Sequence, residues 1–242
     1  MDFGKIKKLD AKVVDAMATE LEIPNSYSRK KKECEIVRML SNYQDYMNKH
    51  QAKFKRQFQI GNEGKEGITY LVKDKNGDSL AMKVFRKTKS PVTLRNEADL
   101  QQTAAIQGAA PKVVEVDTVM KTITMERMDR HLLDVILSNR CLSESQQRGL
   151  VRLFNRLDDA GVFHGDSNLL NYMLRGKKIY LIDYGMSKMI DDSFIKKVKT
   201  SRPNITLMAL GFILKLKELG LGQDNYRIIA EAIPRNESIS LV

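Results

Sequence analysis

The chain has 242 residues, of which 42% are hydrophobic and 29% charged, and this is enough apolar material for a globular protein with a buried core. Its two cysteines form no Cys-x-x-Cys pair, which argues against a disulfide scaffold or a zinc site and favours a reducing compartment. The net charge of +11 has two interpretations, a lysine-rich solvated surface or contact with a polyanion such as nucleic acid.

The first segment, up to about His50, has the pattern of two helices. Apolar residues recur at helical spacing from Leu9 to Leu21, and Pro24 then interrupts the pattern. The basic run at 29–32 follows, and we interpret it as a linker to a second amphipathic helix. The N-terminus has no apolar signal-peptide core. We therefore expect residues 1–55 to form a helical appendage on an intracellular protein.

The rest of the chain is predicted to be a sheet followed by helices. The expected elements are strands at 69–72 and 80–85 around an Asn76-Gly77 turn, a helix at 93–106, strands at 113–116 and 122–125, and then mainly helices, interrupted by turns at 161–171 and a strand at 179–182. This order indicates an α+β fold with a small antiparallel-sheet lobe at 56–128 and a helical lobe at 129–242. The longest apolar run, near 205–216, is too short to span a bilayer, so we expect no membrane partner.

A glycine-rich turn and a lysine mark the sheet lobe. Gly61, Gly64 and Gly67 precede the first predicted strand, and glycines let backbone N–H groups approach phosphates, although an ordinary hairpin turn also contains them. Lys83 lies inside an apolar strand. It either points outward to water or holds nucleotide phosphates, oriented by the carboxylate of Glu97 in the following helix.

Two polar motifs follow in the helical lobe. Asp166 precedes Asn171 by five positions, a spacing that can place a carboxylate at an attacking hydroxyl and an amide oxygen on a metal. Asp183 ends an apolar strand and is followed by Tyr184-Gly185, which offers an oxygen ligand of the kind that Mg²⁺ prefers. The alternative for each motif is a simple turn, because turns favour Asp and Asn.

Together and in this order, these features resemble the protein-kinase superfamily over about residues 58–220. Within it, they are similar to the compact atypical branch, the Rio-type kinases and the small kinase subunit of the KEOPS complex. The similar segments are the loop 64–66 with Tyr70, the lysine strand 81–85, the His-Gly-Asp motif at 164–166 and the metal loop 182–187, which is closer to the KEOPS type.

The resemblance implies a two-lobed protein-kinase-like fold with a reduced helical lobe, and phosphoryl transfer that uses ATP and Mg²⁺. It implies that Asp166 is the catalytic base and that Lys83, held by Glu97, contacts the phosphates. The other implied roles are Gly64, Lys65 and Gly67 over the phosphates, Met125 as gatekeeper, Glu126 to Met128 as adenine-binding hinge, and Asn171 and Asp183 as magnesium ligands.

The chain also departs from the family pattern. Asn62 stands where the first family glycine is expected, Gly165 replaces the usual Arg, and Asn204 replaces the Asp that usually starts the central helix. No Ala-Pro-Glu follows the metal loop, and the stretch 186–203 is short. We therefore expect a reduced peptide-docking platform and activity that does not depend on phosphorylation of an activation loop.

Several functions stay open at this point. The first is a serine/threonine-protein kinase acting on a protein substrate of unknown identity, and small-molecule kinases or slow ATPase switches are alternatives within the same fold. A pseudokinase or basic scaffold is a further alternative. Residues 5–48 loosely resemble a SAP-type module, which implies binding of DNA or another polyanion, whereas a helical pair packed on the small lobe explains the same pattern. The expected location is cytoplasmic or nuclear, or a host cell for a virus-encoded protein.

Overall fold

The computed structural model describes residues 11–61 and 63–234. These residues form two compact units. One holds the described chain up to Arg56 together with the hairpin tip Lys73–Asp78, and the other holds Gln57–Val72 and the described chain from Ser79 onward. The boundaries expected at 55 and 128 stay predictions.

The N-terminal unit is a pair of helices. Helix α2 spans Ala11–Glu20 and helix α3 spans Arg29–Lys53, and both predicted helices are thus present in the described part. Their shared core is small and consists of Val14, Ala18, Ile23 and Ile36. Leu9, which began the predicted pattern, lies outside the described residues.

The basic run at 29–32 is the first turn of α3, so the prediction of a linker there was wrong. Arg and Lys are good helix formers, and two of them are paired inside the unit. Arg29 contacts Glu33 at 2.9 Å, and Lys32 contacts Asp15 of α2 at 2.6 Å. The second contact links the two helices, so part of the basic run contributes to the folding of this unit.

The sheet has five strands in the order β1-β2-β3-β5-β4. Their bounds are Lys55–Gln59, Gly67–Lys73, Ser79–Phe85, Val113–Asp117 and Thr122–Glu126 for β1 to β5. Strand β5 pairs antiparallel with both β3 and β4, which places Lys83 opposite Ile123. The predicted turn between β2 and β3 is confirmed, because the Gly77 N–H donates to the carbonyl of Asp74.

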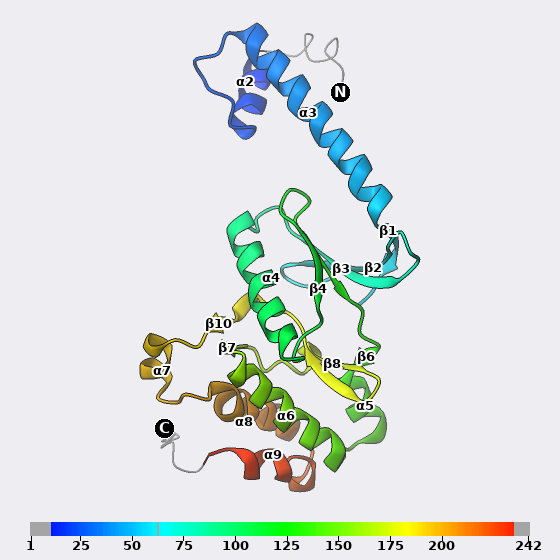
Figure 1. Cartoon of the computed structure of the whole chain (residues 1–242), viewed down its shortest axis with the longest axis vertical. Helices are drawn as coiled ribbons and strands as arrows, with labels where there is room; N and C mark the ends of the chain where they lie inside the picture. The colour runs from blue at the N-terminus through cyan, green and yellow to red at the C-terminus, as the bar shows by residue number, and fades with distance from the viewer. Residues whose placement is uncertain (1–10, 62, 235–242) are drawn as a thin grey trace. The chain divides into compact units, whose positions relative to one another are not determined.

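Helix α4, Pro91–Ile106, crosses one face of this sheet (Figure 1). It begins where the sequence allows it, because Ser90 caps the Thr93 N–H and Pro91 fixes the first helical residue. Leu94 and Ala98 pack into the sheet's core, which brings Glu97 between them to the same buried face.

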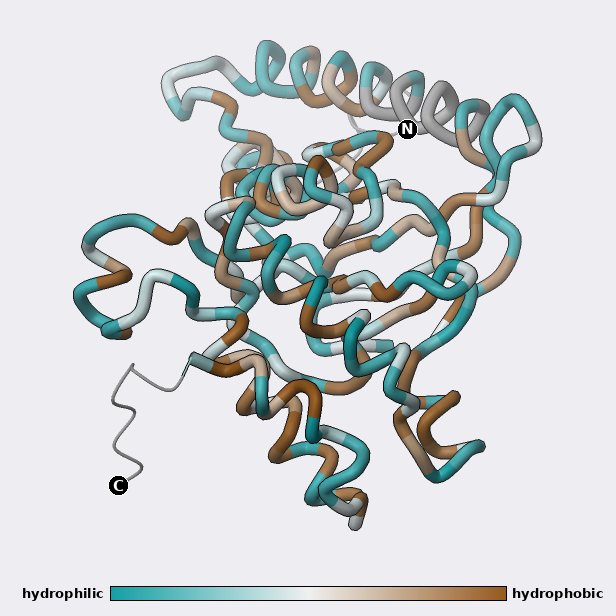
Figure 2. The backbone as a smooth tube through the Cα atoms, turned by 60° about the horizontal axis from the view of Figure 1, so that its bottom comes forward, coloured by the Kyte–Doolittle hydropathy of each residue, from teal (hydrophilic) through white to brown (hydrophobic). Residues whose placement is uncertain are grey.

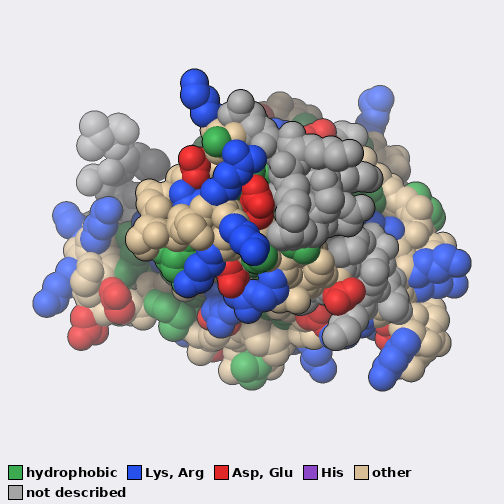
Figure 3. Space-filling model, turned by 90° about the horizontal axis from the view of Figure 1, so that it is seen from above, with side chains coloured by type: hydrophobic (Ala, Val, Ile, Leu, Met, Phe, Trp, Pro, Cys, Tyr) green, Lys and Arg blue, Asp and Glu red, His purple; other side chains and the backbone are tan. Residues whose placement is uncertain are grey.

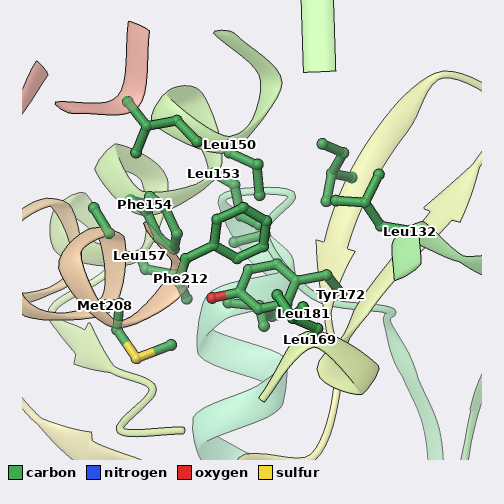
Figure 4. Close-up of a cluster of buried hydrophobic side chains, with 14 of the residues drawn as sticks. Leu132, Leu150, Leu153, Phe154, Leu157, Leu169, Tyr172, Leu181, Met208 and Phe212 are labelled. Atoms are coloured by element: carbon green, nitrogen blue, oxygen red, sulfur yellow. The ribbon is translucent and has the colours of Figure 1, made fainter. Parts of the chain in front are cut away.

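The helical lobe surrounds a second and larger core. Its helices are α5 Leu132–Asn139, α6 Glu144–Asp159, α7 Asp192–Val198, α8 Ala209–Glu218 and α9 Arg227–Ala232. Three aromatic rings meet at its centre (Figure 4). The Tyr172 ring packs edge to face on Phe154, with centroids 6.2 Å apart, and on Phe212, with centroids 4.8 Å apart. This core supports the loops that carry Asp166 and Asp183.

The strand predicted at 179–182 is present as β9, and further short strands occur where mainly helices and turns were predicted. Strands β6 Arg130–His131, β8 Tyr172–Arg175 and β9 Lys178–Leu181 form one small sheet, and β7 Val162–Phe163 pairs with β10 Lys188–Met189. A strand of two residues has no alternating pattern to detect. The expected central helix begins with a π-helical segment, Asn204–Met208, before α8 continues it.

No helix among the described residues is long and apolar enough to cross a membrane. Short hydrophobic and hydrophilic stretches alternate along the chain in Figure 2, as expected for helices that each bury one face.

Candidate active site

Lys83 lies at the centre of the candidate site, on strand β3. Its ammonium group is 2.9 Å from Glu97 Oε1 and 2.8 Å from Asp183 Oδ1. Burial alone lowers the pKa of Lys83, but the charges of Glu97 and Asp183 and their hydrogen bonds outweigh it and raise the pKa overall. The structure thus brings together a strand, α4 and the metal loop at one charged amine.

Asp183 occupies an unusual backbone position directly after strand β9. Its φ of 68° and ψ of 74° lie in the left-handed region that residues other than glycine rarely adopt. Burial raises the pKa of Asp183, yet the charge and hydrogen bond of Lys83 dominate and lower it overall, so the carboxylate is ionised at neutral pH. The fold therefore holds an ionised oxygen ligand at the end of β9.

The loop at 164–171 arranges its polar residues around Asp166. Asn171 Nδ2 donates to Asp166 Oδ2 at 2.8 Å, and the Asn168 N–H donates to Asp166 Oδ1 at 3.0 Å. The Ile182 N–H donates to the Asn171 carbonyl at 3.0 Å, which ties this loop to the residue before Asp183. The predicted base and the two predicted metal ligands therefore come from adjoining segments.

Gly165, the residue that replaces the usual Arg, has a steric reason to be glycine. Its φ is +81°, and a Cβ atom there would lie 3.0 Å from the carbonyl oxygen of Met186. Any larger residue is strained at this position. The His-Gly-Asp motif thus allows the loop at 164–171 and the loop at 182–187 to approach closely.

His164 is fully buried beneath the two loops. Its Nε2 lies 3.0 Å from the Ile182 carbonyl oxygen, and its Nδ1 lies 3.1 Å from the Asp166 carbonyl oxygen and 3.4 Å from the Asp166 nitrogen. Burial is the main cause that lowers the pKa of His164, so the ring is neutral at pH 7. Its role is to link the loop of Asp166 with the strand end before Asp183.

Asn204 and Asp158 anchor this loop to the central helix. The Asn204 side-chain carbonyl accepts from the His164 N–H at 3.1 Å, and its amide donates to the Val162 carbonyl at 2.9 Å. Asp158 accepts from the N–H groups of Asn204 and Ile205 at 2.8 and 3.0 Å. Asn204 stands where the family pattern has Asp, and it connects the helix to the loop.

The predicted phosphate loop lies before strand β2. The Gly64 N–H donates to the Gly67 carbonyl at 2.9 Å, and Lys65 is exposed. Gly67 needs its missing side chain, because a Cβ atom there would lie 2.1 Å from the Val84 carbonyl oxygen. Asn62, at the expected position of the first family glycine, lies outside the described residues.

The predicted hinge residues lie where β5 ends and the chain leaves the sheet. Met125 is buried, and its sulfur accepts from Gln101 Nε2 at 3.3 Å. Glu126 accepts from the Lys112 N–H at 3.1 Å, and Met128 is buried again. The gatekeeper and hinge roles of these residues stay predictions.

Sequence comparison finds relatives among small proteins of the KEOPS complex. The KEOPS complex subunit Bud32 of Pyrococcus abyssi is 30% identical over 117 residues, which cover 45% of this chain and 53% of the relative. The EKC/KEOPS complex subunit BUD32 of Encephalitozoon cuniculi is 32% identical over 95 residues, 39% of this chain and 47% of the relative.

A third relative is a probable bifunctional tRNA threonylcarbamoyladenosine biosynthesis protein of Methanocorpusculum labreanum. It is 30% identical over 90 residues, which cover 37% of this chain and 16% of the relative. No protein-family model matches the chain. The chain spans about half the length of the Bud32 relatives that it matches.

The resemblance to the compact atypical kinases is confirmed. The two-lobed α+β fold expected from that resemblance agrees with the five-stranded antiparallel sheet and the helical lobe. The similarity to the Bud32 proteins covers less than half of this chain.

Two charged residues of the site were not found by sequence reasoning. Lys89, in the turn before α4, lies 2.8 Å from Glu97 Oε2 and 3.2 Å from Glu66 Oε2. Glu66, in the phosphate loop, lies 3.6 Å from the Lys83 ammonium. Burial alone lowers the pKa of Lys89, but hydrogen bonding to Glu97 and the two carboxylate charges raise it overall.

Glu66, Lys89 and Glu97 border an open hollow of about 960 Å³. Its walls are the turn before α4, the face of that helix that carries Glu97, the phosphate loop and the residues after Asp183. Glu66, Glu97 and Asp183 each bring a carboxylate oxygen to within 4.8 Å of one another. Lys83 and Lys89 pair with all three carboxylates and offset two of their three charges, so we do not assign a metal to this acidic group.

Proposed function

We propose that the chain is an atypical kinase that transfers the γ-phosphoryl group of ATP to a serine or threonine of a protein. The observation that carries the proposal is the position of Lys83 between Glu97 and Asp183, at 2.9 and 2.8 Å. The ion pair with Glu97 orients the charged amine of Lys83, as the lysine–glutamate pair of protein kinases does, and Asp183 places the metal loop beside it.

The oxygen donors of the site fit magnesium. Asn171 uses its amide nitrogen on Asp166, which leaves the amide oxygen as a ligand, and Asp183 supplies an ionised carboxylate. Asn171 and Asp183 would hold the ion, and bound Mg²⁺ neutralises charge on the phosphoryl oxygens. Asp166 orients the acceptor hydroxyl and accepts its proton, because its carboxylate is fixed by Asn171 and Asn168.

The remaining assignments concern the nucleotide. Backbone groups of Gly64, Lys65 and Gly67 would cover the phosphates, and the Gly64 N–H first has to leave the Gly67 carbonyl. Met125 as gatekeeper, with Glu126 and Met128 in the hinge, would border the adenine. These roles rest on the family resemblance and on the position of the residues at the end of β5.

Partners are also proposed by analogy. The relatives are named as subunits of the KEOPS complex, and one is named for tRNA threonylcarbamoyladenosine biosynthesis, so we propose that this chain acts within a protein assembly. Binding of DNA or another polyanion by the N-terminal helices has weaker support. Arg29 and Lys32 are used in ion pairs, and the face in Figure 3 intersperses acidic with basic side chains.

Phosphate transfer from labelled ATP tests the proposal. The wild type is compared with Asp183→Ala and with Asp134→Ala, a matched loss of an exposed aspartate in α5, using a generic basic protein as acceptor. Labelled acceptor with the wild type and Asp134→Ala, but not with Asp183→Ala, supports a protein kinase.

Other outcomes select the alternatives. Magnesium-dependent ATP hydrolysis or binding without a labelled protein favours an ATPase switch or a small-molecule acceptor. A wild-type protein that binds no nucleotide contradicts the proposal and favours a pseudokinase or basic scaffold.

A further inference from the structure

A carboxylate of the phosphate loop lies inside the candidate nucleotide site. Glu66 Oε2 is 3.6 Å from the Lys83 ammonium, and a Cβ atom on Gly185 of the metal loop would lie 2.9 Å from the same oxygen. If Lys83 contacts nucleotide phosphates, as proposed above, Glu66 competes with them for the same amine. The Glu66 carboxylate and a nucleotide phosphate are both negative, and they repel each other strongly here because the Lys83 side chain between them is mostly withdrawn from water.

Lys89 offers this carboxylate a second partner. Its ammonium is 3.2 Å from Glu66 Oε2 and 2.8 Å from Glu97 Oε2, and its side chain is only 14% exposed. The residue directly precedes Ser90, which caps α4, so its backbone position is fixed by the start of the helix. Lys89 therefore contacts the Glu97 oxygen that does not face Lys83, and it lies closer than Lys83 does to the Glu66 oxygen that both lysines share.

Glu97, unlike Glu66, divides its two oxygens between the two lysines. One of its oxygens accepts from Lys83 and the other from Lys89, and its side chain is 3% exposed. A buried carboxylate with a different cation on each oxygen has one preferred rotation. Loss of Lys89 frees the second oxygen and lets Glu97 and Glu66 both turn toward Lys83.

We propose that Lys89 is a positioning residue that holds the Glu66 carboxylate away from Lys83 and so keeps Lys83 available to nucleotide phosphates. The inference rests on the proposed function, because it assumes that Lys83 is the phosphate ligand. In a purely structural role, the loss of Lys89 would weaken nucleotide binding whether or not Glu66 is charged. In the proposed role, the loss of nucleotide affinity is caused by the charge of Glu66.

A double-mutant cycle on nucleotide affinity tests this dependence. The variants are Lys89→Met, Glu66→Gln and their combination, and Lys87→Met is the matched control because Lys87 is an exposed lysine of the same turn. The Kd for ATP with Mg²⁺ is measured by titration, and thermal unfolding is recorded for each variant. If Lys89→Met does not fold, Lys89→Gln, which keeps an N–H donor for Glu97, replaces it.

Lys89→Met is expected to raise the Kd about tenfold, the scale of one charge-assisted contact. Adding Glu66→Gln is expected to restore the Kd to within about threefold of the wild type, because the competing charge is then absent. Lys87→Met should bind ATP as the wild type does.

Two results would overturn the inference alone. The first is a wild type that binds ATP together with an unchanged Kd for Lys89→Met, and the second is a raised Kd that Glu66→Gln does not restore. A wild type that binds no ATP overturns the proposed function, and this inference with it.

Discussion

The replacement Asp158→Ala tests how the catalytic loop is anchored. Asp158 has a side chain that is 1% exposed, and it accepts hydrogen bonds from Asn204 N, Asn204 Nδ2 and Ile205 N at 2.8, 2.8 and 3.0 Å. Alanine leaves the backbone N–H groups of Asn204 and Ile205 buried and unpaired, because these residues are 0% and 2% exposed, and it leaves the Asn204 side-chain amide with the Val162 carbonyl alone. We expect a loss of about 3–5 kcal/mol in the free energy of unfolding.

Two companion variants sharpen this test. Asp159→Ala removes the neighbouring carboxylate, which is 58% exposed and pairs with Arg202 at 3.1 Å, so we expect a loss below about 1 kcal/mol. Asp158→Asn keeps one acceptor oxygen. Burial raises the pKa of Asp158 above its ordinary value, so a neutral group is tolerated there. We therefore expect Asp158→Asn to lower the free energy of unfolding by about 1–2 kcal/mol.

Urea unfolding followed by circular dichroism measures these differences, since the free energy of unfolding falls linearly with urea. The anchoring argument is refuted if Asp158→Ala and Asp159→Ala unfold at the same midpoint. It also fails if Asp158→Asn is as damaging as Asp158→Ala, because the loss would then come from the missing charge and not from the missing acceptor.

Three further predictions concern the loop itself. Gly165→Ala should lower the free energy of unfolding by about 1–2 kcal/mol and reduce phosphate transfer, because the φ of Gly165 is +81° and the Met186 carbonyl is close. The control Gly222→Ala should lower it by less than about 0.5 kcal/mol, since no atom lies within 4 Å of the added Cβ. Equal urea midpoints for the two variants would contradict the steric argument. Asp166→Ala should stop phosphate transfer and leave the Kd for ATP within about threefold, because Asp166 contacts Asn171 and not Lys83; retained turnover would remove its assigned role. The pKa of His164 in the folded state lies below its value in the unfolded chain, so the unfolded chain binds a proton on this ring at higher pH than the folded protein does. The free energy of unfolding therefore falls as the pH drops below about 6.5, by at most about 1.4 kcal/mol per pH unit. His164→Gln should lack this part of the pH dependence, and an unchanged slope between pH 7 and 5 would show that His164 does not titrate as described.

Local patterns were sufficient for the main elements of the sheet lobe. The strands around Asn76-Gly77 and the helix after Ser90 were predictable because turn residues, a cap and apolar spacing act over a few positions. The Asp166 and Asn171 pair was predictable for the same reason, since five positions of chain limit how far apart the two side chains can lie. The basic run at 29–32 was misassigned because its helix depends on contacts with Asp15 and Glu33.

The charge network was only partly predictable. Glu97 was expected to orient Lys83, but the sequence contains no signal for Lys89, and Glu66 was noted only as part of the loop 64–66, without a partner. The strand pairs of two residues and the π-helical start of α8 were missed as well, because elements this short have no periodicity.

By itself, the sequence determined the order of strands and helices, the motifs and the class of fold, because short-range backbone preferences and apolar patterns encode them. Only the tertiary structure decided which charges meet. Lys83 contacts a carboxylate 100 positions away in Asp183, and Glu97 divides its oxygens between two lysines. Such contacts depend on how α4 packs on the sheet and on where β9 ends, and no local pattern in the chain records either distance.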